Sequence, residues 1–301
     1  MMTTQDNQKF VELIKSHEPT AGDIEFVEHG YDNIVAVVDR QKVFRFPRTE
    51  VDKYRLWFEA ELLQKMAGKI PKTPRVIRLN QRPFYAVYSY LPGNHLSEEE
   101  IGGLSAKDQA EIGNQLADFI ASFNKLISPS EVLSLRSSSG LAAQPGEETW
   151  PIYLKRVLGD SSFPSNPKIE QLAKDYYQKW LNLKDDLPII TVHDDLHAGN
   201  LLFSDGQISG IFDFGNASAG TATQEMRNIL RLGDDVLRAS ISRYQDLTGQ
   251  TVDPEKARFW MIVNDLASIC LRLLDGKTDA PGFARAQKNL KKWGVISDVA
   301  G

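Results

Sequence analysis

The sequence contains one cysteine, Cys270, in 301 residues, which excludes an internal disulfide framework and any zinc site built on cysteines. No apolar run approaches the roughly 18–20 residues that a membrane-spanning helix needs. The first residues, MMTTQDNQKF, lack the basic and then apolar order of a signal peptide. Dense clusters of lysine and arginine, the usual mark of nucleic-acid binding, are also missing. We therefore expect a cytoplasmic protein that partners neither a membrane nor a nucleic acid.

The composition is that of a globular protein. Hydrophobic residues make up 42% of the chain, which is enough to build a sizeable core at this length. The formal net charge of -5 is compatible with a cationic ligand but does not require one. No internal repeat occurs, so the sequence predicts one large domain or two lobes, and it leaves the oligomeric state open.

The first ninety residues carry the pattern of a small antiparallel sheet. β-Branched and aromatic residues alternate or cluster in five segments, DIEFVEHG, NIVAVVD, QKVFRFP, RVIRL and RPFYAVYSY. Between the third and fourth segments, VDKYRLWFEAELLQKMAG has helical spacing and ends at Gly68. The predicted order is three strands, one helix and two strands, which gives an N-terminal lobe over residues 1–90.

The segment YLPGNHLSEEE breaks this pattern at Pro92 and Gly93, and most of the chain beyond it is helical. Strand-like character returns only within residues 191–214, and SLRSSSGLAAQPGEE is typical of an exposed loop. Helices are predicted over residues 106–126, 150–158, 169–183 and from about 222 onward. We predict a bilobal α+β fold with a hinge near residues 90–94, a mainly helical C-terminal lobe over residues 91–301 and a ligand-binding cleft between the lobes.

A polar stretch within this second lobe, TVHDDLHAGNLLFSDGQISGIFDFG, carries the strongest chemical signal. Phosphoryl transfer needs a group that accepts or orients the proton of the nucleophile, and it needs hard oxygen ligands for Mg²⁺. Asp195 follows His193 as in the H-x-D of a kinase catalytic loop, and Asn200 comes five residues later. Asp213 then begins an Asp-Phe-Gly on the next predicted strand. In this order and spacing, these residues predict a catalytic hairpin for phosphoryl transfer.

Two alternatives to a catalytic hairpin remain open. Asx-rich loops commonly hydrogen-bond their own backbone, which would make the pattern purely structural. His193, His197 and Asp195 are also a candidate zinc set. Two histidines four residues apart share a metal when they lie on a helix, and Gly199 and the flanking strands argue against a helix here.

Residues upstream are compatible with the same chemistry. The segment EHGYDN places Gly30 in a turn where backbone N–H groups can bind phosphate, although an ordinary hairpin turn explains it equally well. Arg45 lies on the third predicted strand, where we expect a cation that faces nucleotide phosphates; a solvated arginine is the alternative. Glu59 on the following helix can pair with Arg45, and Glu61, on a different face of that helix, is the other candidate.

With these residues, the chain resembles the aminoglycoside phosphotransferase family of small-molecule kinases, which have a protein-kinase-like fold. HDDLHAGNLLF and GIFDFGNA are similar to that family's H-G-D-L-H-P-G-N and I-D-F/W-G motifs. GYDN, VFRFPR, FEAELLQKM and YSYLPG extend the similarity upstream. The match is closer to this family than to protein kinases, because no APE segment follows Gly215.

The resemblance implies roles for the hairpin and for the nucleotide site. Asp195 would be the catalytic residue that orients or deprotonates the acceptor hydroxyl, and His193 would support the loop. Asn200 and Asp213 would bind Mg²⁺. The residues that would bind ATP or GTP are Gly30 and Arg45 at the phosphates, Glu59 as the partner of Arg45, and the backbone of Ser89, Tyr90 and Leu91 at the purine.

Three residues depart from the family's pattern. Arg45 stands where lysine is usual, and although arginine binds phosphate well, the two side chains are not equivalent. Asp194 replaces the glycine of H-G-D, and the sequence predicts no role for it. Glu225 is the acid available to stand in for the aspartate of the family's GDPxxD segment.

The acceptor is the least determined part of the prediction. Glu225, Asp234 and Asp235 are the acidic candidates for contact with a cationic acceptor, but acidic pairs at helix starts are often caps. Acids and bases nearly balance over residues 223–275, so the sequence predicts no clear pocket for a cation.

The sequence supports three hypotheses. The first is a Mg²⁺-dependent kinase that moves the γ-phosphate of ATP or GTP to a hydroxyl of an antibiotic, either an aminoglycoside or a macrolide, with a metabolic acceptor such as choline, an amino alcohol or a sugar as the alternative. The second is a protein kinase, which the missing APE segment disfavours. The third is a catalytically silent nucleotide-binding protein, for which Arg45 in place of lysine is the main argument.

Overall fold

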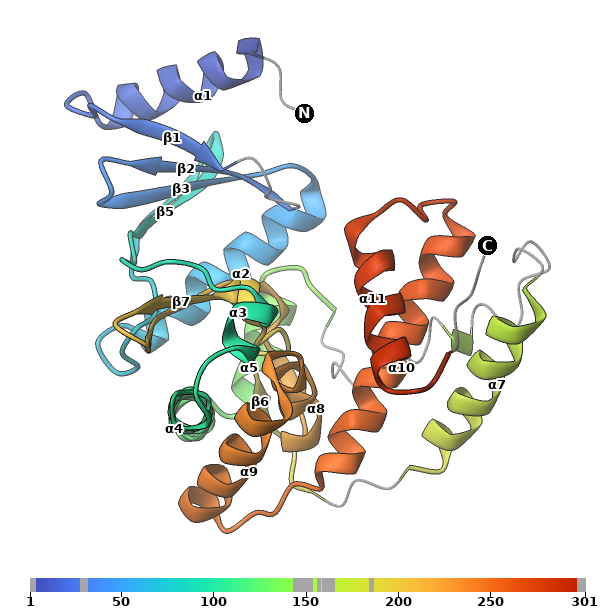
Figure 1. The fold of residues 1–301 in the computed structure, drawn as a ribbon. Helices are drawn as coiled ribbons and strands as arrows, with labels where there is room; N and C mark the ends of the chain where they lie inside the picture. Colours follow the sequence, from blue (N-terminus) through green and yellow to red (C-terminus); the bar gives the residue numbers. More distant parts are fainter. Residues whose placement is uncertain are drawn as a thin grey trace.

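The computed structural model describes residues 4–27, 32–142, 154–155, 158, 166–183 and 187–296. These residues form a smaller lobe made of a sheet with two helices and a larger, mainly helical lobe (Figure 1). The predicted bilobal α+β fold is therefore confirmed. The division of the chain at residue 90 stays a prediction.

The smaller lobe is built on a five-stranded antiparallel sheet in the order β1-β2-β3-β5-β4, so the predicted strands and their order along the chain are present. The strands are β1 (Ile24–Val27), β2 (Asn33–Val38), β3 (Lys42–Pro47), β4 (Val76–Gln81) and β5 (Phe84–Ser89). Side chains alternate across β3, where Phe44 and Phe46 are buried on one face. Arg45 therefore points to the opposite face.

A first helix, α1 (Thr4–His17), was not among the predicted elements. It packs on the face of the sheet that carries Phe44 and Phe46, through Phe10 and the fully buried Ile14 (Figure 1). The apolar positions of this helix do have helical spacing, but the polar start of the chain, TTQDNQKF, obscured the pattern. This helix completes the core on that side and leaves the other face for the site.

The second helix, α2 (Glu50–Met66), covers the face to which Arg45 points. Thr49 begins it with a capping box, in which the Thr49 side chain accepts from the backbone of Asp52 and the Asp52 side chain accepts from the backbone of Thr49. Phe58 and Leu62 are buried in the core between the helix and the sheet. Glu59, which follows Phe58, is buried at the edge of this core, where the two lobes meet.

The larger lobe has two hydrophobic cores. Its helices are α3 (Glu98–Gly102), α4 (Ala106–Leu126), α5 (Pro129–Ser138), α7 (Pro167–Leu181), α8 (Ala222–Ile229), the short η4 (Leu230–Leu232), α9 (Asp234–Thr248), α10 (Pro254–Leu274) and α11 (Pro281–Lys292). The first core extends from α2 through α4 and α9, and the second joins α7, α10 and α11. Among the described helices, none combines the length and apolar character that a membrane crossing needs.

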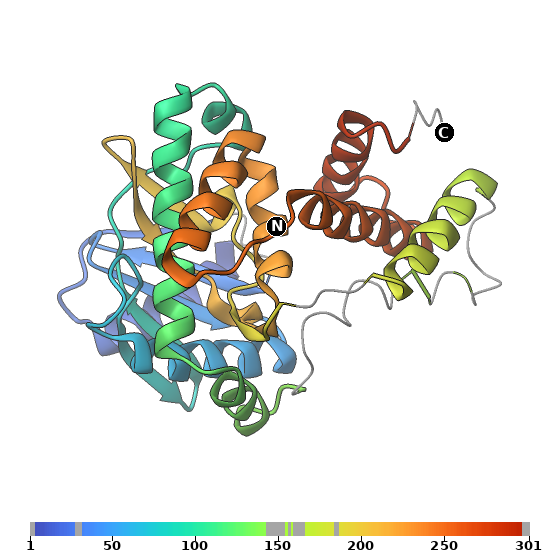
Figure 2. The same cartoon turned by 90° about the horizontal axis from the view of Figure 1, so that it is seen from below.

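The helices α4 and α9 lie side by side, and α7, α10 and α11 form a separate group (Figure 2). Gly113 permits the close approach of α4 to α9, because a Cβ there would lie 2.5 Å from the carbonyl oxygen of Val236. Ser240 of α9 donates a hydrogen bond to the carbonyl of Gly113 at 3.0 Å across the same contact. These contacts pack α4 closely against α9 within the larger lobe.

The predicted strand-like stretch forms two small antiparallel sheets within the larger lobe. Strand β6 (Ile190–Val192) pairs with β9 (Ser218–Gly220), and β7 (Leu201–Ser204) pairs with β8 (Gln207–Ile211). The polar residues of the catalytic hairpin therefore lie on the connections between these strands.

One prediction on the connections was wrong, and two others lie largely outside the described residues. The segment expected to be an exposed loop from residue 134 is helical at its start, because α5 continues to Ser138. The side chain of Ser128 caps α5 by accepting from the backbone of Glu131, and Val132 and Leu135 bury one face of it. The rest of that loop, from residue 143, and most of the helix predicted over 150–158 lie outside the described residues.

Candidate functional site

Asp195 lies on the connection from β6 to β7, and three side chains hold its carboxylate. Nδ2 of Asn200 donates to the main-chain carbonyl of Asp195 at 2.9 Å and to its Oδ2 at 3.3 Å. Nδ2 of Asn216 also donates to Oδ2 at 3.3 Å, and Nε2 of His197 lies 3.4 Å from Oδ1. The Asp195 side chain is still 28% exposed, so a hydroxyl group can reach it. Asn216 was not predicted, because its segment GNA carries no pattern that points to Asp195.

His197 orients Asp195 as a neutral ring. Its Nδ1 accepts a hydrogen bond from the backbone N–H of Gly199 at 3.0 Å, so the proton of the neutral imidazole belongs on Nε2, which faces Asp195. Burial lowers the pKa of His197, and although the Asp195 charge raises it, the charges of Arg231 and Arg285 lower it further. The ring therefore adds a directed N–H to the carboxylate at neutral pH without adding a charge.

His193 does not join His197 in a metal site. It is fully buried, its Nε2 lies 3.1 Å from the carbonyl oxygen of Phe212, and its ring packs against Phe214 with centroids 4.6 Å apart. Burial lowers the pKa of His193. In the part of the chain that the structure describes, no group of three or more His, Cys, Asp or Glu side chains could hold a metal. The zinc alternative is not supported, and His193 supports the loop instead.

Arg45 links the two lobes through acidic partners on both. Its Nη1 donates to the two carboxylate oxygens of Glu59 at 2.8 and 2.6 Å, and its Nη2 donates to Oδ1 of Asp213 at 3.2 Å. Glu59 also accepts the backbone N–H of Phe214 at 3.1 Å. The predicted pair of Arg45 with Glu59 is therefore present, while Glu61 accepts from the indole of a neighbouring tryptophan on α2.

Burial and the neighbouring charges shift the pKa values of Glu59 and Arg45. Burial raises the pKa of Glu59 to about 7, with the Arg45 charge and the Phe214 N–H acting in the opposite direction. Burial also acts to lower the pKa of Arg45, but the charges of Glu59 and Asp213 outweigh it and raise that pKa above its ordinary value. Arg45 is therefore a permanent cation, and its side chain is largely buried, with 16% of it exposed.

Asp213 and Asn200 offer oxygens of the kind that Mg²⁺ prefers. The Asp213 side chain is 43% exposed, and its backbone adopts a left-handed conformation, with φ of 67°, that turns the residue at the end of β8. Because Nδ2 of Asn200 is used on Asp195, its Oδ1 is left as an acceptor. One carboxylate and one amide oxygen, completed by nucleotide phosphates, is an ordinary donor set for Mg²⁺, so these residues fit the ion.

The hinge offers a single backbone donor near the predicted purine site. The N–H of Ser89 is bound to the carbonyl of Arg75 at 2.8 Å, and the N–H of Tyr90 to the carbonyl of Gln41 at 2.9 Å. The N–H of Leu91 makes no hydrogen bond to any described residue, and the residue after it is proline. Among the three predicted hinge contacts, Leu91 is therefore the one whose N–H is available.

Asp194, for which the sequence predicted no role, is bound by four residues of α8. Its Oδ1 accepts from Nη2 of Arg227 at 2.5 Å and from Nε2 of Gln224 at 3.0 Å. Its backbone N–H donates to Oε2 of Glu225 at 3.0 Å, and its carbonyl accepts from Nδ2 of Asn228 at 2.8 Å. The residue beside Asp195 is thereby fixed to one buried helix.

The backbone at Asp194 is left-handed, with φ of 65°. Glycine adopts this conformation without strain, and aspartate is one of the few other residues that tolerates it. This accounts for a glycine at the matching position of the family's motif. It also shows what the aspartate adds here, namely an acceptor for the buried guanidinium of Arg227, whose side chain is 2% exposed.

The acidic acceptor candidates are not brought together. Glu225 is 1% exposed and binds the backbone of the catalytic loop. Asp234 and Asp235 lie in the first turn of α9, where Asp234 pairs with Arg258 at 2.8 Å and Asp235 pairs with Arg238. Both carboxylates therefore already have cationic partners.

The burial of Glu225 predicts a pH dependence of stability. Burial, together with the Asp194 charge, raises the pKa of Glu225 to about 8, against an ordinary value of 4.5. Between these values the folded chain holds a proton that the unfolded chain has lost, so this group's contribution makes the free energy of unfolding fall as the pH rises through this window. Glu225→Gln removes this titration. The difference in the free energy of unfolding, variant minus wild type, should therefore rise by up to roughly 1 kcal/mol for each pH unit from pH 5 to pH 8.

Urea unfolding at several pH values measures this difference. Glu170→Gln, at an exposed position of α7, is the matched control and should give a curve parallel to that of the wild type. A Glu225→Gln curve that also runs parallel to the wild type would show that Glu225 is ionised in the folded protein.

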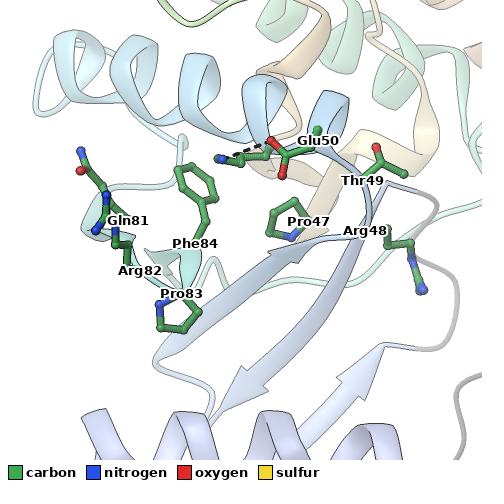
Figure 3. A pocket seen from close by; sticks show the side chains of 9 residues that line it. Pro47, Arg48, Thr49, Glu50, Gln81, Arg82, Pro83 and Phe84 are labelled. Carbon is green, nitrogen blue, oxygen red and sulfur yellow. Dashed lines mark hydrogen bonds and ion pairs between the residues drawn. The ribbon is translucent and has the colours of Figure 1, made fainter.

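Two cavities lie outside the group formed by Asp195, Asn200 and Asp213. The first, of about 600 Å³, opens between the start of α2 and the β4–β5 turn (Figure 3). It is lined by Pro47, Arg48, Thr49, Glu50, Lys53, Gln81, Arg82, Pro83 and Phe84. The second, of about 340 Å³, includes Ser89, Tyr90 and Leu91. Neither contains Asp195, and Gly30, predicted to lie at the phosphates, falls outside the described residues.

A protein-family model described as the phosphotransferase enzyme family matches residues 23–260. No curated protein matches the chain. The matched range contains the N-terminal sheet, α2 and the whole catalytic hairpin.

Solved structures with similar folds include antibiotic phosphotransferases. The GDP and kanamycin complex of APH(2″)-IIIa aligns with a TM-score of 0.78 and 18% identity, over 94% of this chain and 97% of that one. The streptomycin–ATP–APH(2″)-IIa ternary complex aligns with a TM-score of 0.70 and 18% identity, over 95% and 97%. Macrolide 2′-phosphotransferase type I aligns with a TM-score of 0.66 and 19% identity, over 96% and 98%. At these identities the likeness is one of fold.

Proposed function

Because the chain belongs to the phosphotransferase enzyme family, we propose that it is a Mg²⁺-dependent kinase that transfers the γ-phosphate of ATP or GTP to a hydroxyl group of a small molecule. One observation supports the proposal: five side chains from the two lobes form two hydrogen-bonded groups, which the hydrogen bond from the Phe212 N–H to the Asn200 carbonyl links, and together they would suit phosphoryl transfer. They are Arg45, Glu59, Asp195, Asn200 and Asp213.

On the acceptor side, Asp195 is the proposed catalytic residue. Its carboxylate would accept the proton of the acceptor hydroxyl as the hydroxyl oxygen bonds to the γ-phosphorus and the bond to the bridging oxygen of the diphosphate breaks. His197 and Asn216 hold the carboxylate in one orientation for this transfer. Because the Asp195 carboxylate is already oriented, it would not need to reorganise during proton transfer.

On the nucleotide side, Arg45 is the proposed phosphate contact and Glu59 holds it in place. Asn200 and Asp213 would hold Mg²⁺, which when bound supplies positive charge that stabilises the transferring phosphoryl group. The N–H of Leu91 is the proposed hinge donor to the purine, with Ser89 and Tyr90 shaping the hinge around it.

For the acceptor, the first proposal is an antibiotic, an aminoglycoside or a macrolide, because enzymes that bind kanamycin and streptomycin and a macrolide phosphotransferase share the fold. A metabolic hydroxyl compound is the second. One observation favours the second over a polycationic aminoglycoside: the acidic candidates Asp234 and Asp235 are paired with arginines, and Glu225 is buried.

A coupled nucleotide-consumption assay tests the function. The wild type, given ATP or GTP with Mg²⁺, should consume nucleotide faster when one member of a panel of aminoglycosides, macrolides, amino alcohols and sugars is added. Asp213→Asn should reduce both basal and stimulated turnover to the level of the assay blank, since the remaining amide is a weaker ligand for Mg²⁺. Asp205→Asn, on the exposed β7–β8 turn, is the control and should behave as the wild type.

Nucleotide binding without any turnover, under all of these conditions, would contradict the proposal. It would instead favour the catalytically silent nucleotide-binding alternative.

A further inference from the structure

Beside the catalytic loop, polar and charged side chains of α3, η4, α10 and α11 contact one another in pairs. Among them is Arg231 of η4, whose side chain is 8% exposed. Its contacts are weak, because Nη2 lies 3.5 Å from Oδ1 of Asp265 and Nε lies 3.3 Å from the sulfur of Met261. Asp265 is bound more closely by Nδ2 of Asn289, at 2.8 Å.

The Nη1 atom of Arg231 has no hydrogen-bond partner within the described ranges. A buried guanidinium that leaves a donor edge open is costly unless a ligand completes it. The open edge of Arg231 is therefore the first observation that points to an anionic ligand.

Arg285 of α11 is the second observation. It is exposed, and no acid in the described part of the chain lies within ion-pair distance of it. Beyond the effect of burial, its charge lowers the pKa values of His197, Glu98 and Arg231. Asn289, one helical turn further along α11, binds Asp265, which also pairs with Arg231, so Arg285 lies on the face of α11 that is turned toward η4.

The acids Asp265 and Glu98 do not make a site for a polycation. Asp265 is buried and bound to Arg231 and Asn289. Burial raises the pKa of Glu98 of α3, whereas the charges of Arg231 and Arg285 lower it, so this acid is already offset by cations. An aminoglycoside carries several ammonium groups, and its binding would need acids that are not already offset by cations.

We propose that Arg231 and Arg285 bind an anionic group of the acceptor, so that the acceptor is a hydroxylated small molecule bearing a carboxylate or a phosphate, and that Glu98 accepts a hydrogen bond from a donor of the same molecule. The planar guanidinium suits both anions, because its N–H groups pair with two oxygens at once. The inference rests on the proposed kinase function, and it narrows the acceptor toward metabolic compounds.

Calorimetric binding of simple anionic probes tests this assignment. The protein is first saturated with Mg²⁺ and a non-hydrolysable analogue of ATP or GTP, so that Arg45 and the metal site are occupied. Two matched pairs of probes are then titrated, gluconate with glucitol for the carboxylate and glycerol 3-phosphate with glycerol for the phosphate. The anion of at least one pair should bind more tightly than its uncharged parent, and Arg285→Gln should weaken that anion about tenfold or more, as expected for a lost charge-assisted pair.

Arg243→Gln on α9, which removes an exposed arginine paired with Asp118, is the matched control and should leave anion binding unchanged. Arg231→Gln should weaken the same anion, and because Arg231 is buried, Arg285→Gln carries the test if that variant does not fold. Anions that bind no better than their parents, or equally well in Arg285→Gln, would overturn the inference, as would tighter binding of kanamycin than of either anion.

The two proposals fail separately. Mg²⁺-dependent nucleotide turnover that is lost in Asp195→Ala supports the kinase function whether or not anions bind. Anion binding that depends on Arg285 supports the acceptor class even if turnover is absent.

Discussion

Asp195→Asn should lower kcat for phosphotransfer by about 10²–10⁴, the range that a positioned general base contributes. The substituted amide keeps the size of the side chain and can still meet Asn200 and Asn216, but it cannot take the proton of the acceptor hydroxyl. Nucleotide affinity should not change, since the Arg45–Glu59 pair and the hinge are untouched. Steady-state phosphotransfer to an acceptor found in the screen, together with nucleotide titration, measures both quantities.

Asp205→Asn is the matched control, because Asp205 belongs to the same hairpin and its side chain is exposed on the β7–β8 turn. It should retain the activity of the wild type. Full phosphotransfer by Asp195→Asn would show that another group accepts the proton, and a parallel loss of nucleotide binding would show that the substitution disturbs the fold of the loop.

Asp194→Ala should lower the free energy of unfolding by about 3–5 kcal/mol, the cost of leaving one member of a buried ion pair without its partner. The side chains of Arg227 and Asp194 are 2% and 11% exposed, so water cannot replace the lost carboxylate fully. Since the same residue adjoins Asp195, kcat should fall as well. Asp194→Asn should lose less of both, because it keeps an acceptor oxygen and tolerates the left-handed backbone.

Asp205→Ala provides the reference for this measurement. Asp205 also has a positive φ, 52°, but it is exposed and makes no ion pair with any described residue, so its substitution measures mainly the cost of alanine in that conformation. The double variant Asp194→Gly with Arg227→Met should recover most of the stability, because it removes the buried charge and restores glycine at the left-handed position. If Asp194→Ala and Asp205→Ala cost the same, the ion pair with Arg227 contributes nothing.

The features that could be predicted are those that depend on residues close together in the sequence. Asp195, Asn200 and Asp213 lie within one hairpin, so their spacing alone indicated a common site. The pair of Arg45 with Glu59 followed from the succession of strand and helix. The roles of these residues in catalysis and binding stay predictions.

The parts that were missed depend on partners that no spacing reveals. Asp194 contacts Arg227 because α8 packs against the loop. The two residues are more than thirty positions apart, and no sequence motif relates them. Asn216 reaches Asp195 only after β8 turns back toward the loop. The helix α1 was missed because its polar residues outnumber the few apolar residues that bind it to the sheet.

Arg45 pairs with Glu59 of the smaller lobe and with Asp213 of the larger lobe. One contact between the lobes is therefore made by the same side chains that are proposed to bind phosphate and metal. A metal ion bound by Asp213 would compete with the guanidinium of Arg45 for that carboxylate, and nucleotide phosphates would offer Arg45 another anion. Binding of the nucleotide and the metal would therefore replace the contact between Arg45 and Asp213 with contacts to the ligands. Substitution at Arg45 should therefore change both a contact between the lobes and the binding of nucleotide.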